Sequence, residues 1–67
     1  MKRKELKNIA KKIAEQELII QSNTDKSIIN NAEKEIVRLS SGILYLEDMV
    51  AIDELITEIL EKNKKNS

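Results

Sequence analysis

The 67-residue chain contains almost none of the residues that interrupt a helix, since it has no proline and a single glycine, Gly42. It also lacks phenylalanine and tryptophan, so the aromatic and turn-forming residues that a β-sandwich or barrel needs are scarce. Eleven isoleucines and seven leucines stand among many lysines and glutamates, which is typical of helices that pack through aliphatic stripes. The composition therefore predicts an all-α fold, formed by a single helical domain over residues 1–67.

Three helices are predicted, at about residues 2–21, 25–41 and 46–62. In the first, apolar residues recur on one face from Leu6 to Ile20, at the spacing of an α-helix. The polar segment 22–25 ends this helix, and one of residues 23–25 is expected to cap the second helix with a side-chain oxygen. The second helix carries a narrow apolar stripe that runs from Ile28 to Ile43.

Residues 41–48 have to contain a bend or a short loop. The stripe of the second helix can be extended through Ile43, but a further stripe that begins at Tyr45 is out of phase with it by more than half a turn. Gly42 fits a left-handed helix C-cap, and Ser40 and Ser41 are typical hydrogen-bonding residues of a helix terminus. Three helices joined in this way predict a small bundle.

The short length favours completion of this bundle by a second copy. A domain of this size buries only about 60% of the surface of its unfolded chain, and apolar residues off the stripes, such as Val37 and Leu44, also need cover. We therefore expect a homo-oligomer, with a dimer favoured over a monomeric bundle. The residues expected at the oligomer or partner interface are Leu6, Ile13, Ile20, Ile36, Ile43, Tyr45, Met49, Ile52 and Ile56.

The net charge is zero, but residues 1–12 carry +5 and residues 47–61 carry −6. One interpretation is that a basic first helix lies against an acidic last helix, within one chain or across a dimer. Another is a basic arm that binds phosphates or a small anionic ligand, although no aromatic residue is available to stack on bases beside it. The candidate anion contacts are Lys2, Arg3, Lys4, Lys7, Lys11 and Lys12, and the candidate acidic partner face consists of Glu47, Asp48, Glu54, Glu58 and Glu61.

Glu17 interrupts the apolar stripe of the first helix. Its carboxylate can reach solvent past its own stem or pair with a lysine or arginine of another helix. Alternatively, it is a buried specificity group or a ligand contact. An unpaired buried carboxylate would cost several kcal/mol, so a buried Glu17 needs a partner.

Several classes of chemistry are excluded or disfavoured. The chain has no cysteine and no histidine, which excludes thiolate nucleophiles, Cys/His zinc sites and histidine acid–base catalysis. Carboxylate pairs such as Asp53 and Glu54 are typical of a solvated acidic face. We therefore expect no enzymatic activity, no catalytic residue, no cofactor and no metal. No apolar run approaches the roughly 18 residues of a membrane span, and no secretory signal is recognisable, which favours a cytoplasmic protein without membrane contact.

Residues 6–21 (LKNIAKKIAEQELIIQ) and 46–60 (LEDMVAIDELITEIL) resemble small uncharacterised helical proteins of Gram-positive bacteria and their phages. The resemblance implies an accessory protein of a phage or mobile element, and it carries over no functional residue. The leading hypothesis is a self-associating interaction protein that binds or inhibits a host or defence component, or that sequesters a ligand. The alternatives are a nucleic-acid-binding regulator that uses the basic first helix, and a structural or assembly module.

Overall fold

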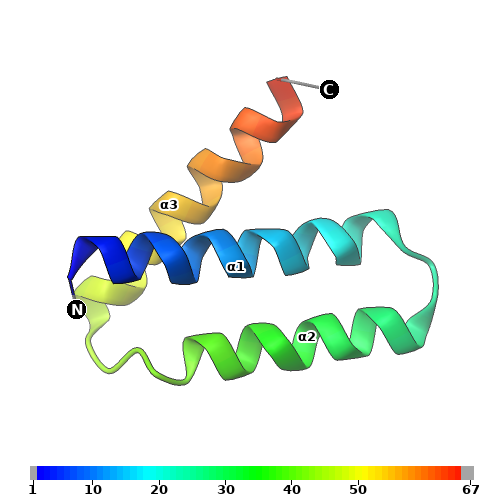
Figure 1. Ribbon diagram of the computed structural model, residues 1–67, viewed down its shortest axis with the longest axis horizontal. Helices are drawn as coiled ribbons and strands as arrows, with labels where there is room; N and C mark the ends of the chain where they lie inside the picture. The colour runs from blue at the N-terminus through cyan, green and yellow to red at the C-terminus, as the bar shows by residue number, and fades with distance from the viewer. Residues whose placement is uncertain (1, 66–67) are drawn as a thin grey trace.

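The computed structural model describes residues 2–65, and the side chains of residues 2–63, as three helices joined by two short loops (Figure 1). The helices are α1 (Arg3–Ser22), α2 (Lys26–Ser40) and α3 (Leu46–Lys65). No strand occurs among the described residues, so the predicted all-α class and the three-helix bundle are confirmed. The predicted boundaries agree within one residue, except that α3 continues three residues beyond its predicted end.

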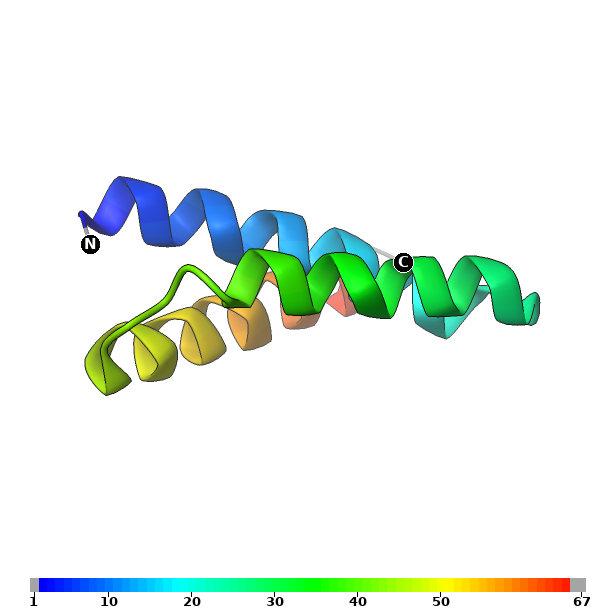
Figure 2. The same ribbon diagram turned by 90° about the horizontal axis from the view of Figure 1, so that it is seen from below.

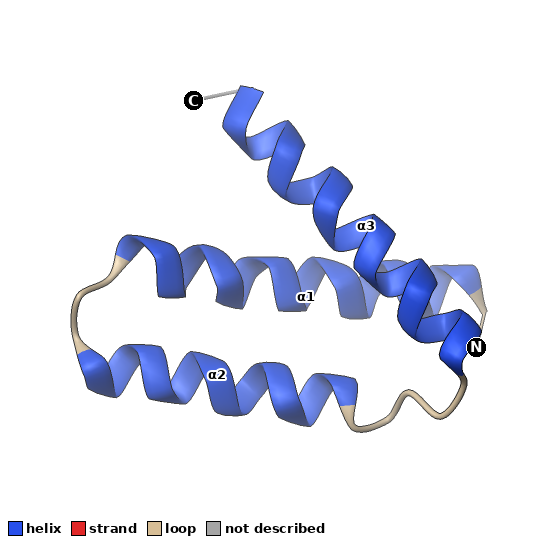
Figure 3. Ribbon diagram, turned by 180° about the vertical axis from the view of Figure 1, so that it is seen from behind, coloured by secondary structure: helices blue, strands red, loops and turns tan. Residues whose placement is uncertain are grey.

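Helix α1 is the centre of the fold, because both other helices pack against it. Helix α2 runs back along α1 in the opposite direction, whereas α3 starts near the N-terminal end of α1 and crosses it (Figures 1 and 3). The backbones of α2 and α3 do not approach each other closely anywhere in the described part of the chain. The molecule is consequently flat, measuring 34 × 27 × 15 Å, as the view in Figure 2 shows.

The hydrophobic core lies on the inner face of α1. Ala10 and Ala14 are both 0% exposed, and their small side chains allow neighbouring elements to approach the α1 backbone closely. Larger side chains surround them, but none of the described ones is completely buried. The core cluster contains Leu6, Ala10, Ile13 and Ala14 of α1 together with Ile43, Ile52 and Ile56.

The loop between α1 and α2 is closed by side-chain hydrogen bonds at both helix ends. The Asn23 backbone N–H and its side-chain Nδ2 each donate to the Ile19 carbonyl, at 3.1 and 3.0 Å. Asp25 Oδ1 accepts from the Ser27 backbone N–H at 2.9 Å. Asp25 is therefore the residue that caps α2, and this bond satisfies one of the free amides at the start of the helix.

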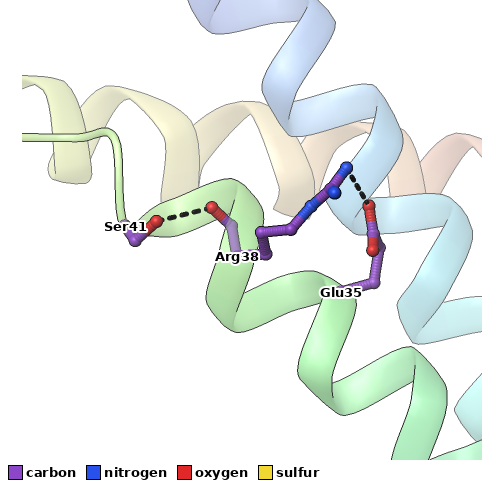
Figure 4. A network of polar contacts seen from close by, with 3 residues as sticks. All are labelled: Glu35, Arg38 and Ser41. Atoms are coloured by element: carbon purple, nitrogen blue, oxygen red, sulfur yellow. Dashed lines mark hydrogen bonds and ion pairs between the residues drawn. The ribbon is translucent and has the colours of Figure 1, made fainter.

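The junction between α2 and α3 is a loop and not a helix bend. The Ser40 hydroxyl donates to the Val37 carbonyl at 3.1 Å. The Ser41 hydroxyl donates to the Arg38 carbonyl at 2.7 Å (Figure 4), so the role of both serines at the helix terminus is confirmed. The left-handed C-cap predicted at Gly42 is wrong, since Gly42 has no positive φ. The Val37 carbonyl also accepts from the Ser41 backbone N–H at 3.0 Å, whereas the Ser41 hydroxyl satisfies the Arg38 carbonyl, which a left-handed cap would otherwise satisfy.

Gly42 is therefore a position where alanine fits. Its φ is not positive, and a Cβ added there meets nothing within 4 Å. We expect Gly42→Ala to raise the free energy of unfolding by about 0.4–1 kcal/mol, because alanine reduces the conformational entropy of the unfolded chain. Urea unfolding followed by circular dichroism measures the change, and a loss of stability would contradict the backbone conformation of this loop.

Ala14 tests the packing around α1. Because Ala14 is 0% exposed, we expect Ala14→Leu to lower the free energy of unfolding by about 1–3 kcal/mol through overpacking. Lys11→Leu introduces the same side chain at an exposed position of α1, and it should change stability by no more than about 0.5 kcal/mol. Equal effects of the two substitutions in thermal unfolding would contradict the placement of the core.

Candidate functional site

The residues expected at an oligomer or partner interface fall into two groups. Tyr45 and Met49 are exposed, and Ile20 and Ile36 are partly buried. The others are used inside the single chain, where they form most of the core. These core residues are Leu6, Ile13, Ile43, Ile52 and Ile56.

An exposed apolar surface lies where the second loop enters α3, and we call Leu44, Tyr45, Leu46 and Val50 the apolar corner. Their exposed fractions are 84%, 66%, 76% and 53%. Leu46 and Val50 are one turn apart, so they share a face of α3. Isolated exposed apolar residues are ordinary, but adjacent ones mark surfaces that bind other molecules.

Of the apolar corner, only Tyr45 is among the residues expected at an interface from the sequence. The loop at residues 41–45, which lies within the expected bend or loop at 41–48, ends the second helix before Leu46 and Val50. Only Ile43 of residues 43–45 is buried, and Leu46 and Val50 then lie on the outer side of α3. Their position on the helix identifies Leu46 and Val50 in the sequence, because helical spacing places both away from the stripe that carries Ile52 and Ile56.

A groove opens between α2 and α3, with a volume of about 240 Å³. Most of its lining is apolar, and Met49 lies between the groove and the apolar corner. Helix α1 supplies Ile13 and Glu17 to the lining, between residues contributed by α2 and α3. The residues lining the groove are Ile13, Glu17, Ile36, Ser40, Ile43, Met49, Ile52, Asp53 and Ile56.

Two carboxylates line this groove without a cation beside them. Glu17 is half-buried and Asp53 is exposed. Neither side-chain carboxylate forms an ion pair or hydrogen bond with another described residue, although the Asp53 backbone carbonyl accepts from Thr57 Oγ1 at 2.9 Å. No lysine or arginine lines the groove. Pairing of Glu17 with a basic residue of another helix, one of the alternatives open from the sequence, is therefore absent from the described part of the chain, and the groove carries negative charge.

The six basic residues near the N-terminus are all exposed. Lys2 occupies the N-cap position of α1 without a side-chain cap, and Arg3 and Lys4 follow in the first turn. Cations there oppose the positive end of the helix dipole, which makes this helix start locally unfavourable. Helix α1 does lie against α3 as expected, but no ion pair joins these bases to Glu47, Glu54, Glu58 or Glu61 among the described side chains.

Charge contacts elsewhere on the surface are local. Arg38 Nη2 lies 3.1 Å from Glu35 Oε1, one turn away on α2 (Figure 4). The Arg38 side chain is largely solvated and that of Glu35 partly so, and such a pair on one helix contributes only about 0.3–0.5 kcal/mol. Ile19, which lies off the main stripe of α1, is half-buried and lines a shallow depression together with Ile28 and Ala32 of α2. It therefore covers part of the neighbouring helix α2.

The structure adds two observations about chemistry and environment. Among the described residues, no three potential metal-ligating side chains come together. No helix in that part of the chain has both the length and the apolar character needed to cross a bilayer.

Comparisons of the chain with protein-family models, with curated proteins and with solved structures found no match.

Proposed function

We propose that the chain is a non-enzymatic, self-associating interaction protein. The observation that carries this proposal is the exposure of the apolar corner, where Leu44, Tyr45, Leu46 and Val50 are 84%, 66%, 76% and 53% exposed. Monomeric proteins rarely expose a contiguous group of large apolar side chains, and such patches mark surfaces that bind other molecules.

The apolar corner supplies the surface for this association. Leu44, Tyr45 and Leu46 are consecutive, and none of them contacts the core extensively. In a two-fold dimer the same patch of each copy packs against the other, so an exposed apolar patch can cover itself. Glu47, which is exposed and follows Leu46 directly, then lies at the solvated rim, where charge is tolerated.

A non-enzymatic role agrees with the residues that the chain contains. It has neither histidine nor cysteine, and its hydroxyl groups therefore have no imidazole base to activate them. The Ser40 and Ser41 hydroxyls already donate to backbone carbonyls. These observations support binding, not catalysis, as the activity of the protein.

The biological setting that we propose is the cytoplasm of a bacterial cell or of a phage-infected host. There the chain acts as an accessory factor that binds and inhibits a host or defence component. This part of the proposal is supported by the resemblance of residues 6–21 and 46–60 to small helical proteins of Gram-positive bacteria and their phages.

A nucleic-acid-binding role and a purely structural role are the alternatives. Phosphate binding through Lys4, Lys7 and Lys11 predicts an affinity that falls steeply as salt is raised from about 50 to 200 mM. A structural module predicts that charge-neutralising changes on the acidic side of α3 leave its activity intact. An electrophoretic shift assay at low salt decides the first alternative, because complete absence of binding there excludes it.

Self-association is tested by a double substitution in the apolar corner. We expect the wild-type protein to sediment as a dimer or higher oligomer and Leu46→Asp/Val50→Asp to sediment as a monomer with unchanged helix content. The reason is that a charge placed in an apolar interface loses its hydration. Val37→Asp is the control. The exposed fraction of Val37, 66%, lies between those of Leu46 and Val50, but Val37 lies on α2.

Sedimentation velocity over a wide range of concentration gives the readout. The control variant should retain the wild-type oligomer, while circular dichroism verifies that all three proteins are equally helical. A wild-type protein that remains monomeric at high concentration would contradict self-association. An equal loss of association in the Val37 variant would contradict the location of the interface.

A further inference from the structure

We infer that the groove between α2 and α3 binds a basic amphipathic helix of another protein. The helix that fits presents apolar side chains together with a lysine or arginine on one face. This inference deepens the proposed function because it names the chemistry of the partner. It rests on one part of that proposal, namely that the chain binds other proteins. It does not depend on whether the chain also binds itself.

The arrangement of the helices leaves a place for a fourth. Both α2 and α3 pack on α1, and their backbones stay apart in the described part of the chain. A helix laid along the groove would contact Ile36 on one side and Met49 on the other, above Ile13 of α1. Such docking of the apolar face of a helix into a groove is a recurrent mode of protein recognition, and it would produce a four-helix arrangement.

The size of the groove also favours side chains over a whole small molecule. Its volume of about 240 Å³ is below the roughly 300–1,000 Å³ typical of pockets that enclose a small ligand. Because its lining is mostly isoleucine and methionine, the groove suits a few aliphatic or aromatic side chains. Methionine is a flexible residue that adapts to different apolar partners.

The negative charge of the groove favours a partner with positive charge. Glu17 comes from α1 and Asp53 from α3, and neither carboxylate has a described partner. A lysine or arginine on the docked helix would meet these carboxylates where the helix itself excludes water, so the pairing would be stronger than at an open surface. An acidic helix of the same shape would be repelled.

A second copy of this chain does not supply such a helix. The basic helix of the chain is α1, and its apolar face is already buried through Leu6, Ala10 and Ile13. Two copies docked groove to groove would place Glu17 and Asp53 of one copy opposite those of the other, with no basic residue in the lining to compensate. The observations therefore favour a different protein as the occupant.

The test uses a synthetic peptide of leucine and lysine with the residues placed to form one apolar helical face. Its length is 15 residues, equal to that of α2, and a peptide with glutamate in place of every lysine is the matched probe. We expect fluorescence anisotropy to show binding of the leucine–lysine peptide to the full-length protein. The leucine–glutamate peptide should bind at least about tenfold more weakly, because opposite and like charges differ by more than 1 kcal/mol at such sites.

Neutral isosteres locate the binding site. Glu17→Gln and Asp53→Asn should each weaken binding of the leucine–lysine peptide by about tenfold, with helix content and thermal stability unchanged or improved. Glu54→Gln and Glu61→Gln remove the same charge from exposed positions of α3 outside the groove. These controls should change the affinity less than about twofold, since solvated charges contribute little.

Four outcomes would overturn the inference: no binding of the leucine–lysine peptide, equal binding of the two peptides, an equal effect of the control substitutions, or occupation of the groove by a second copy. The last would appear as dissociation of the homo-oligomer by Met49→Asp while Leu46→Asp/Val50→Asp leaves it intact. The failure of self-association is distinguishable from the failure of this inference. A monomeric wild-type protein that binds the peptide in the groove supports the inference and contradicts self-association.

Discussion

The rest of the structure depends on the burial of one face of α1. Ala10 and Ala14 are completely buried there, and both other helices obtain their core by packing on this helix. Because α2 and α3 gain little from each other, the position of α3 is fixed mainly by α1 and by the short loop that holds Ile43 in the core. Small side chains at the centre permit close packing, but they also limit the apolar area that the fold can bury.

That limit explains why the candidate surfaces are found where they are. A chain of this size has too little apolar material to surround a central helix, so part of it stays exposed. Of the seven exposed large apolar side chains among the described residues, five lie within residues 44–50, and one of these, Met49, also lines the groove. The molecule thus presents two different surfaces. The apolar corner consists of apolar side chains, whereas the neighbouring groove also contains the carboxylates of Glu17 and Asp53, so the two surfaces suit different partners.

The sequence was sufficient for the helices and insufficient for the surfaces. Periodicity and the polar break at residues 22–25 located the helices, and Asp25 was among the expected caps. The conformation of Gly42 was missed because the adjacent Ser41 hydroxyl satisfies the Arg38 carbonyl at the helix end by another route. The surroundings of Glu17 could not be derived from its own helix, since the groove exists only through the angle between α2 and α3, and that angle is a property of tertiary packing.

The unpaired carboxylates of the groove connect stability with function. Glu17 is half-buried and has no partner among the described residues, and withdrawing a charge from water without pairing it costs free energy. Residues that destabilise the free state and become satisfied in a complex are typical of binding sites, where stability is given up for recognition. A partner helix that pairs with Glu17 and Asp53, as we propose, would also cover Ile36 and Met49, and its binding would then be thermodynamically linked to folding. Under this proposal the exposed apolar residues and the charge of the groove have one common explanation, in which the isolated chain is an incomplete bundle that other molecules complete.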